Sequence, residues 1–172
     1  RLKLLVLGPF DGDRRYGTSS NAFQIMFASG VVPKVTDKFQ VVFGNAAENP
    51  LKALPEAKGL SFDSYYEFHL FSDDNYALPR KFGRVHGADF VALLARDKEH
   101  GYFYLTLIDV ENERGVYEGK GSRKNLTQLV FSEFKRMVAQ AEPAMARALS
   151  RKGSALARAR GGGTAPGEAA AS

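Results

Sequence analysis

The 172-residue chain contains no cysteine and no tryptophan. Without cysteine there can be no disulfide, thiolate metal site or cysteine nucleophile, but the compartment stays open because many periplasmic domains lack this residue. Long apolar runs are missing too, and none approaches the roughly 18 residues that a transmembrane helix needs. We therefore expect a soluble chain that does not span a membrane.

Recognised catalytic and phosphate-binding motifs are also absent. The turn at residues 8–13 lacks the glycine spacing of a nucleotide-binding loop, and Asp11 and Asp13 would repel a phosphate. No G-x-S-x-G elbow exists. No metal-ligand spacing relates the three histidines, which are His69, His86 and His100. We predict that the protein is not an enzyme and has no catalytic, metal-binding or cofactor-binding residues.

With 44% hydrophobic residues, the chain can bury one core. We expect a single domain over residues 1–152, followed by a disordered or weakly helical tail over 153–172, where small residues and glycine leave almost nothing to bury. The chain starts at Arg1 rather than Met, and Leu2 already belongs to an apolar run. This favours an upstream targeting segment that has been removed.

The first half of the chain predicts strands joined by helical crossovers. Apolar runs at 2–7 and 39–43 suit buried strands, and 65–71 alternates as a third strand does. Between the first two, the spacing of Phe23, Phe27, Val31 and Val35 predicts a helix, with a kink at Pro33, which removes a backbone donor.

The second half predicts a helix feeding an antiparallel meander. Pro79 fits the first turn of a helix that ends near His86, and Gly87 fits its left-handed C-cap. Strands follow at 90–95, 102–110 and 115–120. We expect one face of the meander to be core, made by Phe90, Leu93, Phe103, Leu105 and Leu107.

A last helix is predicted from Asn125, with a bend or restart at Pro143. Its apolar face consists of Leu126, Val130, Phe134, Met137, Ala141 and Met145. The order of elements indicates an α/β fold, a single-domain mixed sheet with a parallel crossover part and an antiparallel meander, covered by helices.

The net charge of +5 is concentrated near the carboxyl end of the chain. Residues 1–119 hold 14 basic and 16 acidic residues, whereas 120–160 hold 10 basic and 2 acidic ones. Such asymmetry favours an acidic partner, although a solvated helix face is an equally good explanation. The candidate interaction residues are Arg147, Arg151, Lys152, Arg158 and Arg160.

Three segments resemble a family of bacterial envelope domains. They are an opening strand that ends in Pro9-Phe10, a helix-to-strand junction at Gly87-Ala88-Asp89, and a hairpin in which Asp109-Val110 precedes Gly115. The family includes the amino-terminal domain of TolB, the curli secretion lipoprotein CsgG and outer-membrane lipoproteins that activate penicillin-binding proteins. The segments that would form a curli-type pore are missing, so membrane-pore formation by this chain is not expected.

The resemblance implies a non-catalytic periplasmic lipoprotein module that binds partners in outer-membrane secretion, polymer export or cell-wall synthesis. It implies an outer-membrane tether upstream of Arg1, and a partner that is an envelope protein, a second copy, anionic lipid or cell-wall polymer. The alternative is a nucleic-acid-binding domain that uses the basic carboxy-terminal region and the aromatic strands. No RNP-like string or KH-type loop supports this alternative.

Overall fold

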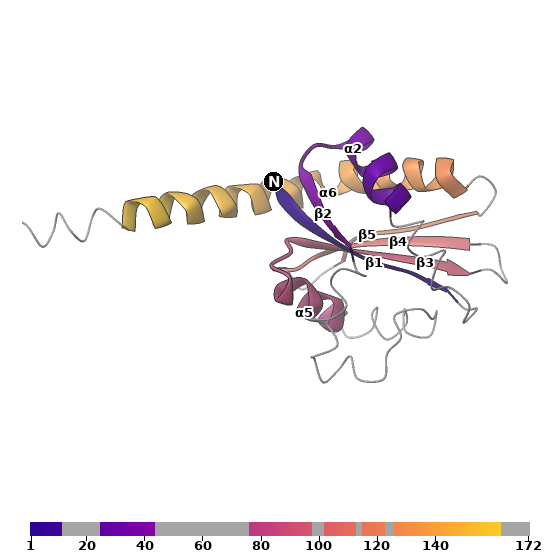
Figure 1. Ribbon diagram of the computed structural model, residues 1–172, viewed down its shortest axis with the longest axis horizontal. Coiled ribbons are helices and arrows are strands. Elements are labelled where there is room, and N and C mark those ends of the chain that lie inside the picture. The colour runs from indigo at the N-terminus through magenta and orange to yellow at the C-terminus, as the bar shows by residue number, and fades with distance from the viewer. Residues whose placement is uncertain (12–24, 44–75, 98–101, 113–114, 123–125, 163–172) are drawn as a thin grey trace, which may run out of the picture.

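The computed structural model describes residues 1–11, 25–43, 76–97, 102–112, 115–122 and 126–162. Five strands form one sheet in the order β2-β1-β3-β4-β5 (Figure 1). Their bounds are β1 Leu2–Asp11, β2 Phe39–Phe43, β3 Phe90–Asp97, β4 Tyr102–Asp109 and β5 Gly115–Ser122. The strand predicted at 65–71 lies outside the described residues.

The sheet is mixed, as the order of elements predicts. Strand β1 runs parallel to both β2 and β3, while β3, β4 and β5 form an antiparallel meander. Strand β1 extends beyond the apolar run at 2–7, and its register with β3 shifts between Leu7 and Phe10. The fold class is confirmed as a single α/β domain with a mixed sheet covered by helices.

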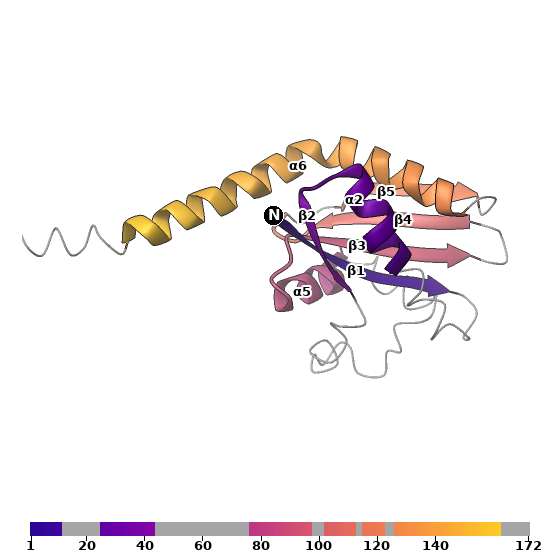
Figure 2. The ribbon, with the colours of Figure 1, turned by 45° about the horizontal axis from the view of Figure 1, so that its top comes forward.

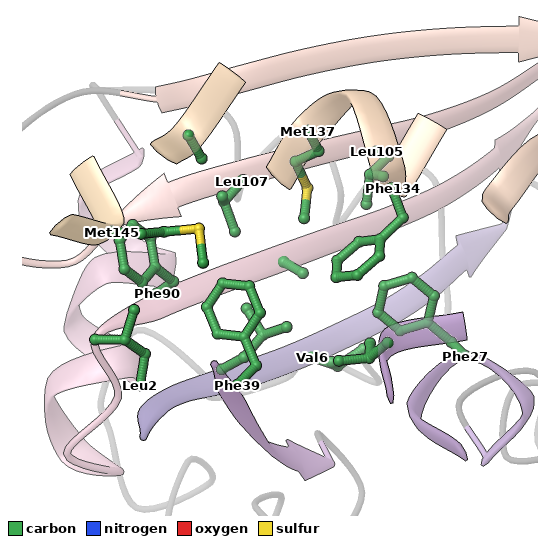
Figure 3. Close-up of a cluster of buried hydrophobic side chains, with 14 of the residues drawn as sticks. Leu2, Val6, Phe27, Phe39, Phe90, Leu105, Leu107, Phe134, Met137 and Met145 are labelled. Carbon is green, nitrogen blue, oxygen red and sulfur yellow. The ribbon is translucent and has the colours of Figure 1, made fainter. Parts of the chain in front are cut away.

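One face of the sheet packs against two helical segments. A π-helical turn, η1 (Phe27–Val31), continues into α2 (Val32–Val35), and the long helix α6 (Leu126–Gly162) lies beside them. Aromatic rings meet edge to face, with 5.1 Å between the ring centroids of Phe27 and Phe134 (Figure 3). The fully buried residues of this core include Leu2, Leu4, Val6, Phe27, Phe90, Ala92, Leu94, Leu105, Leu107, Phe134, Met137, Ala141 and Met145.

The predicted disturbance at Pro33 takes the form of the π turn. The Val32 backbone N–H donates to the Phe27 carbonyl, five residues back. Because Pro33 has no N–H, the helical hydrogen-bond ladder cannot continue through it, and a π turn absorbs the irregularity. Phe27 and Val31 are buried and Val35 is partly buried, as their spacing predicts, while Phe23 lies outside the described residues.

Helix α5 (Ala77–Val85) covers the opposite face of the sheet. Its core partners include Leu5, Leu7, Val91, Leu93 and Ile108. The prediction that Leu93 faces the same core as Leu105 is therefore wrong, although both are buried. Leu93 pairs with Thr106, one position away from Leu105, and side chains alternate between faces along a strand. The side chain of Phe103 lies outside the description.

Helix α6 continues past the domain boundary expected at Lys152. It ends at Gly162, so residues 153–162 are helical, which is one of the two states expected of the tail, while residues 163–172 lie outside the described residues. Pro143 lies inside the helix and does not restart it, although Figure 2 shows a change of direction between the part on the sheet and the projecting part. On the predicted apolar face, Phe134, Met137, Ala141 and Met145 are buried. The side chains of Leu126 and Val130 lie outside the description.

The close approach of α5 to the sheet yields a prediction. A Cβ at Gly83 would lie 2.6 Å from Val110 Cγ2 and 2.9 Å from Val91 Cγ2. We expect Gly83→Ala to lower the free energy of unfolding by about 1 to 3 kcal/mol, measured by urea denaturation, because the helix must move off the sheet. The matched control is Gly153→Ala in α6, where a Cβ meets nothing within 4 Å and helix propensity alone predicts a stability equal to or above that of the parent. Equal behaviour of the two variants would contradict this packing.

Candidate functional site

All five predicted interaction residues lie in the last part of α6. Ala148 is the last buried residue of the helix, and every residue from Ser150 to Gly161 is exposed. At 1.5 Å per residue, the ten residues after Lys152 extend about 15 Å beyond the domain. Figure 2 shows this part of the helix projecting from the sheet. The sequence between 143 and 162 has five basic residues and no acidic one.

Lys152 reaches back to the domain instead of extending away from it. Its Nζ lies 2.7 Å from Asp89 Oδ2 and donates a 2.8 Å hydrogen bond to the carbonyl of Arg1. Because Lys152 follows the buried positions Met145 and Ala148 on the same side of the helix, its side chain leaves the core face at the point where the sheet ends. Lys152 thus links the helix to the first residue of the chain.

Arg151 also faces an acidic residue of the domain. Its Nη2 lies 3.8 Å from Oδ1 of Asp109, whose side chain is 1% exposed. The Asp109 carboxylate already accepts hydrogen bonds from the backbone of Glu111 and from the backbone and side chain of Asn112. Arg151 therefore adds a long-range contact to a carboxylate whose main partners are in its own turn. Of the five candidate interaction residues, Arg151 and Lys152 therefore contact the domain.

The two acidic residues lie at the same end of the neighbouring strands β3 and β4. Asp89 immediately precedes β3, and Asp109 ends β4 opposite Phe90. The sequence predicts that Asp89 hydrogen-bonds backbone in the turn. The structure shows a wider role, because Asp89 Oδ2 accepts from the Lys3 backbone N–H at 2.7 Å, 86 residues away. Neither contact to α6 has a local signal in the sequence, since both join segments distant along the chain.

The helix-to-strand junction at Gly87-Ala88-Asp89 explains how Asp89 is positioned. Gly87 has a φ of +61°, and the backbone N–H groups of Gly87 and Ala88 donate to the carbonyls of Arg84 and Gly83. This is the Schellman pattern that ends a helix with a left-handed residue, and it confirms the predicted C-cap. The turn delivers Asp89 directly to the start of β1, where its own N–H donates to the Lys3 carbonyl.

The remaining three basic side chains have no partner among the described residues. Among the described residues, none makes a hydrogen bond or ion pair with Arg147, Arg158 or Arg160. The spacings of four and seven residues place Arg147, Arg151 and Arg158 along one side of α6, and we call these three residues the basic stripe. Ser150, Ser154 and Ala157 line a shallow open depression together with Arg151 and Arg158. Arg160 lies on another side, one turn beyond the exposed Leu156.

The described parts of the chain contain no group of three or more histidine and acidic residues that could hold a metal ion. None of the described helices is long and apolar enough to cross a membrane. His86 is the C-cap residue of α5, and its carbonyl accepts a 2.7 Å hydrogen bond from Lys3 Nζ. His69 and His100 lie outside the described residues.

Comparison with known proteins gives a distant structural likeness. No family model matches the sequence, and no curated protein matches it. The crystal structure of the lipoprotein GNA1162 from Neisseria meningitidis superimposes with a TM-score of 0.47 and 15% sequence identity. The match covers 81% of this chain and 97% of that chain. A likeness at this level carries no functional argument.

The contacts of Asp89 predict two different costs. Asp89→Ala removes the acceptor of the partly buried Lys3 backbone N–H as well as the ion pair with Lys152. We therefore expect a loss of about 2 kcal/mol in the free energy of unfolding. Lys152→Met keeps an unbranched apolar side chain and removes a partly exposed ion pair and an exposed hydrogen bond to the Arg1 carbonyl, which predicts a loss of about 0.2 to 1 kcal/mol. Urea denaturation measures both.

The control for this pair is Arg158→Met, which removes an exposed charge from the same helix without a described contact. Its stability should stay within about 0.5 kcal/mol of the parent. If Lys152→Met costs as much as Asp89→Ala, the ion pair to α6 and not the Lys3 contact is the main role of the Asp89 carboxylate.

Proposed function

We propose that this protein is a non-catalytic module of the bacterial envelope, held at the outer membrane through a segment upstream of Arg1. It docks onto a partner in secretion, polymer export or cell-wall synthesis, and α6 presents the docking surface. The observation that supports this proposal is the projecting basic end of α6, which has no acidic residue from 143 to 162.

The local structure of the resembling segments adds support. The Gly-Ala-Asp unit ends α5 and starts β3, and the Asp109-Val110 unit ends β4 before β5 begins at Gly115. In each unit the acidic side chain binds backbone N–H groups, which is a structural role. These carboxylates are therefore occupied in holding the fold, and the surface left for partners is the exposed helix.

The envelope assignment predicts where the native gene product lies in its own bacterium. We expect the tagged protein, expressed with its natural upstream residues, to be digested when protease is added to spheroplasts, while a cytoplasmic marker stays intact. It should fractionate with membranes in the same cells. Protection from protease together with the cytoplasmic marker would overturn the proposal.

The alternative function is nucleic-acid binding, which the same basic helix favours. Phosphate contacts through three free arginines would make binding steeply dependent on salt. We expect fluorescence anisotropy with labelled single-stranded DNA and RNA to give dissociation constants weaker than about 10⁻⁴ M near physiological salt. Submicromolar binding that is lost when Arg147, Arg158 and Arg160 are changed to glutamine would favour the alternative. Point substitutions are the sharper test, because a chain that ended at Ser150 would also lack the fold contacts of Lys152.

A further inference from the structure

We infer that the basic stripe of α6 docks onto the anionic headgroup surface of a lipid bilayer. This inference deepens the proposed function and rests on it, because it names the class of surface that the projecting helix contacts. The stripe consists of Arg147, Arg151 and Arg158, and its first and last residues are eleven positions apart, or about 16 Å along the helix.

Charge complementarity is the first support. No acidic side chain lies between residues 143 and 162, so within this segment nothing on α6 neutralises the stripe. The nearest described carboxylate is that of Asp109, 3.8 Å from Arg151, and it is almost fully buried. A guanidinium near an anionic leaflet strengthens binding by about fivefold for each residue, so two free arginines and one partly engaged arginine give a measurable affinity.

The side chains between the arginines are the second support. Ser150, Ser154 and Ala157 are small, so the stripe offers guanidinium groups and hydroxyls over a shallow, open surface. The hot spots of protein interfaces are most often Trp, Tyr and Arg residues that fill desolvated pockets, whereas the stripe is open and residues 143–162 contain no aromatic residue. In the described part of α6 the exposed large hydrophobic residue is Leu156, which lies away from the stripe. The stripe therefore suits a flat anionic surface better than a shaped protein groove.

The position of Arg1 is the third support, and it favours a bilayer over nucleic acid. The Arg1 carbonyl accepts a 2.8 Å hydrogen bond from Lys152, in the middle of the basic segment. Figures 1 and 2 both show the amino terminus beside the part of α6 that leaves the sheet. A membrane tether upstream of Arg1 would thus emerge next to the stripe. Tethering would raise the effective concentration of the bilayer surface at the stripe, so that modest intrinsic affinity suffices.

The test uses the full 172-residue chain and vesicles in co-sedimentation. We expect binding to vesicles of equal parts phosphatidylglycerol and phosphatidylcholine, little binding to pure phosphatidylcholine, and loss of binding as salt rises from about 50 to 500 mM. The variant with Arg147→Gln and Arg158→Gln should bind the anionic vesicles at least tenfold more weakly. Both side chains are exposed, so the fold should be unaffected, which circular dichroism and urea denaturation check.

The matched control removes the same charge from elsewhere. Lys34 and Arg84 are exposed on α2 and α5, on opposite faces of the sheet. The variant with Lys34→Gln and Arg84→Gln should keep anionic-vesicle binding within about twofold of the parent, since screening limits the reach of distant charges.

Three outcomes would overturn the inference. They are equal loss in the two double variants, absence of binding that depends on phosphatidylglycerol, and binding of DNA or RNA through the stripe at least tenfold tighter than of anionic vesicles. Failure of this inference is distinguishable from failure of the proposed function. If the protein is digested by protease in spheroplasts but does not bind anionic vesicles, the envelope proposal stands and only the lipid surface is excluded. The helix would then bind an acidic protein or polymer.

Discussion

The fold depends on the contacts of one residue, Asp89, which immediately precedes the central strand β3. Its backbone N–H and side-chain Oδ2 pair with the carbonyl and N–H of Lys3, and its carbonyl accepts from Val110 N–H at 3.1 Å. A single residue therefore joins the starts of β1 and β3 to the end of β4. The Schellman turn at Gly87 ends α5 and positions Asp89 at the start of β3. Because Lys152 of α6 also contacts the Asp89 carboxylate, the helices on both faces of the sheet are connected through this residue.

Helix α6 has two parts with different physical bases. Its first part is held by the core, where Phe134, Met137 and Met145 are completely buried against the sheet. Its last part buries nothing, and alanine-rich sequence with good helix propensity is what extends it. Between the two parts, Lys152 and Arg151 contact the carboxylates of Asp89 and Asp109 at the ends of β3 and β4. These contacts hold α6 to the domain at the point where its projecting segment begins.

The comparison of sequence with structure separates local from distant effects. Five of the six predicted strands, the described part of the apolar face of α6, the turn at Gly87 and the irregularity at Pro33 follow from periodicity and backbone chemistry within a few residues, and the structure confirms them. The prediction that Leu93 and Leu105 share one face of the sheet was wrong, because Leu93 pairs with Thr106 and neighbouring residues of a strand point to opposite faces. For the tail after Lys152 the sequence left disorder and weak helix open, because it buries almost nothing, while alanine and arginine favour a helix without burial.

The candidate site shows the same division. The sequence by itself determined the mixed α/β fold, the absence of acidic residues from 143 to 162, and the five basic residues that give this segment its charge. Only the tertiary structure decided that Lys152 and Arg151 turn back to Asp89 and Asp109 while Arg147, Arg158 and Arg160 stay exposed. The reason is that these partners are separated by more than forty residues along the chain. No local pattern encodes such contacts, because they arise only when the core has placed the end of the sheet beside the helix.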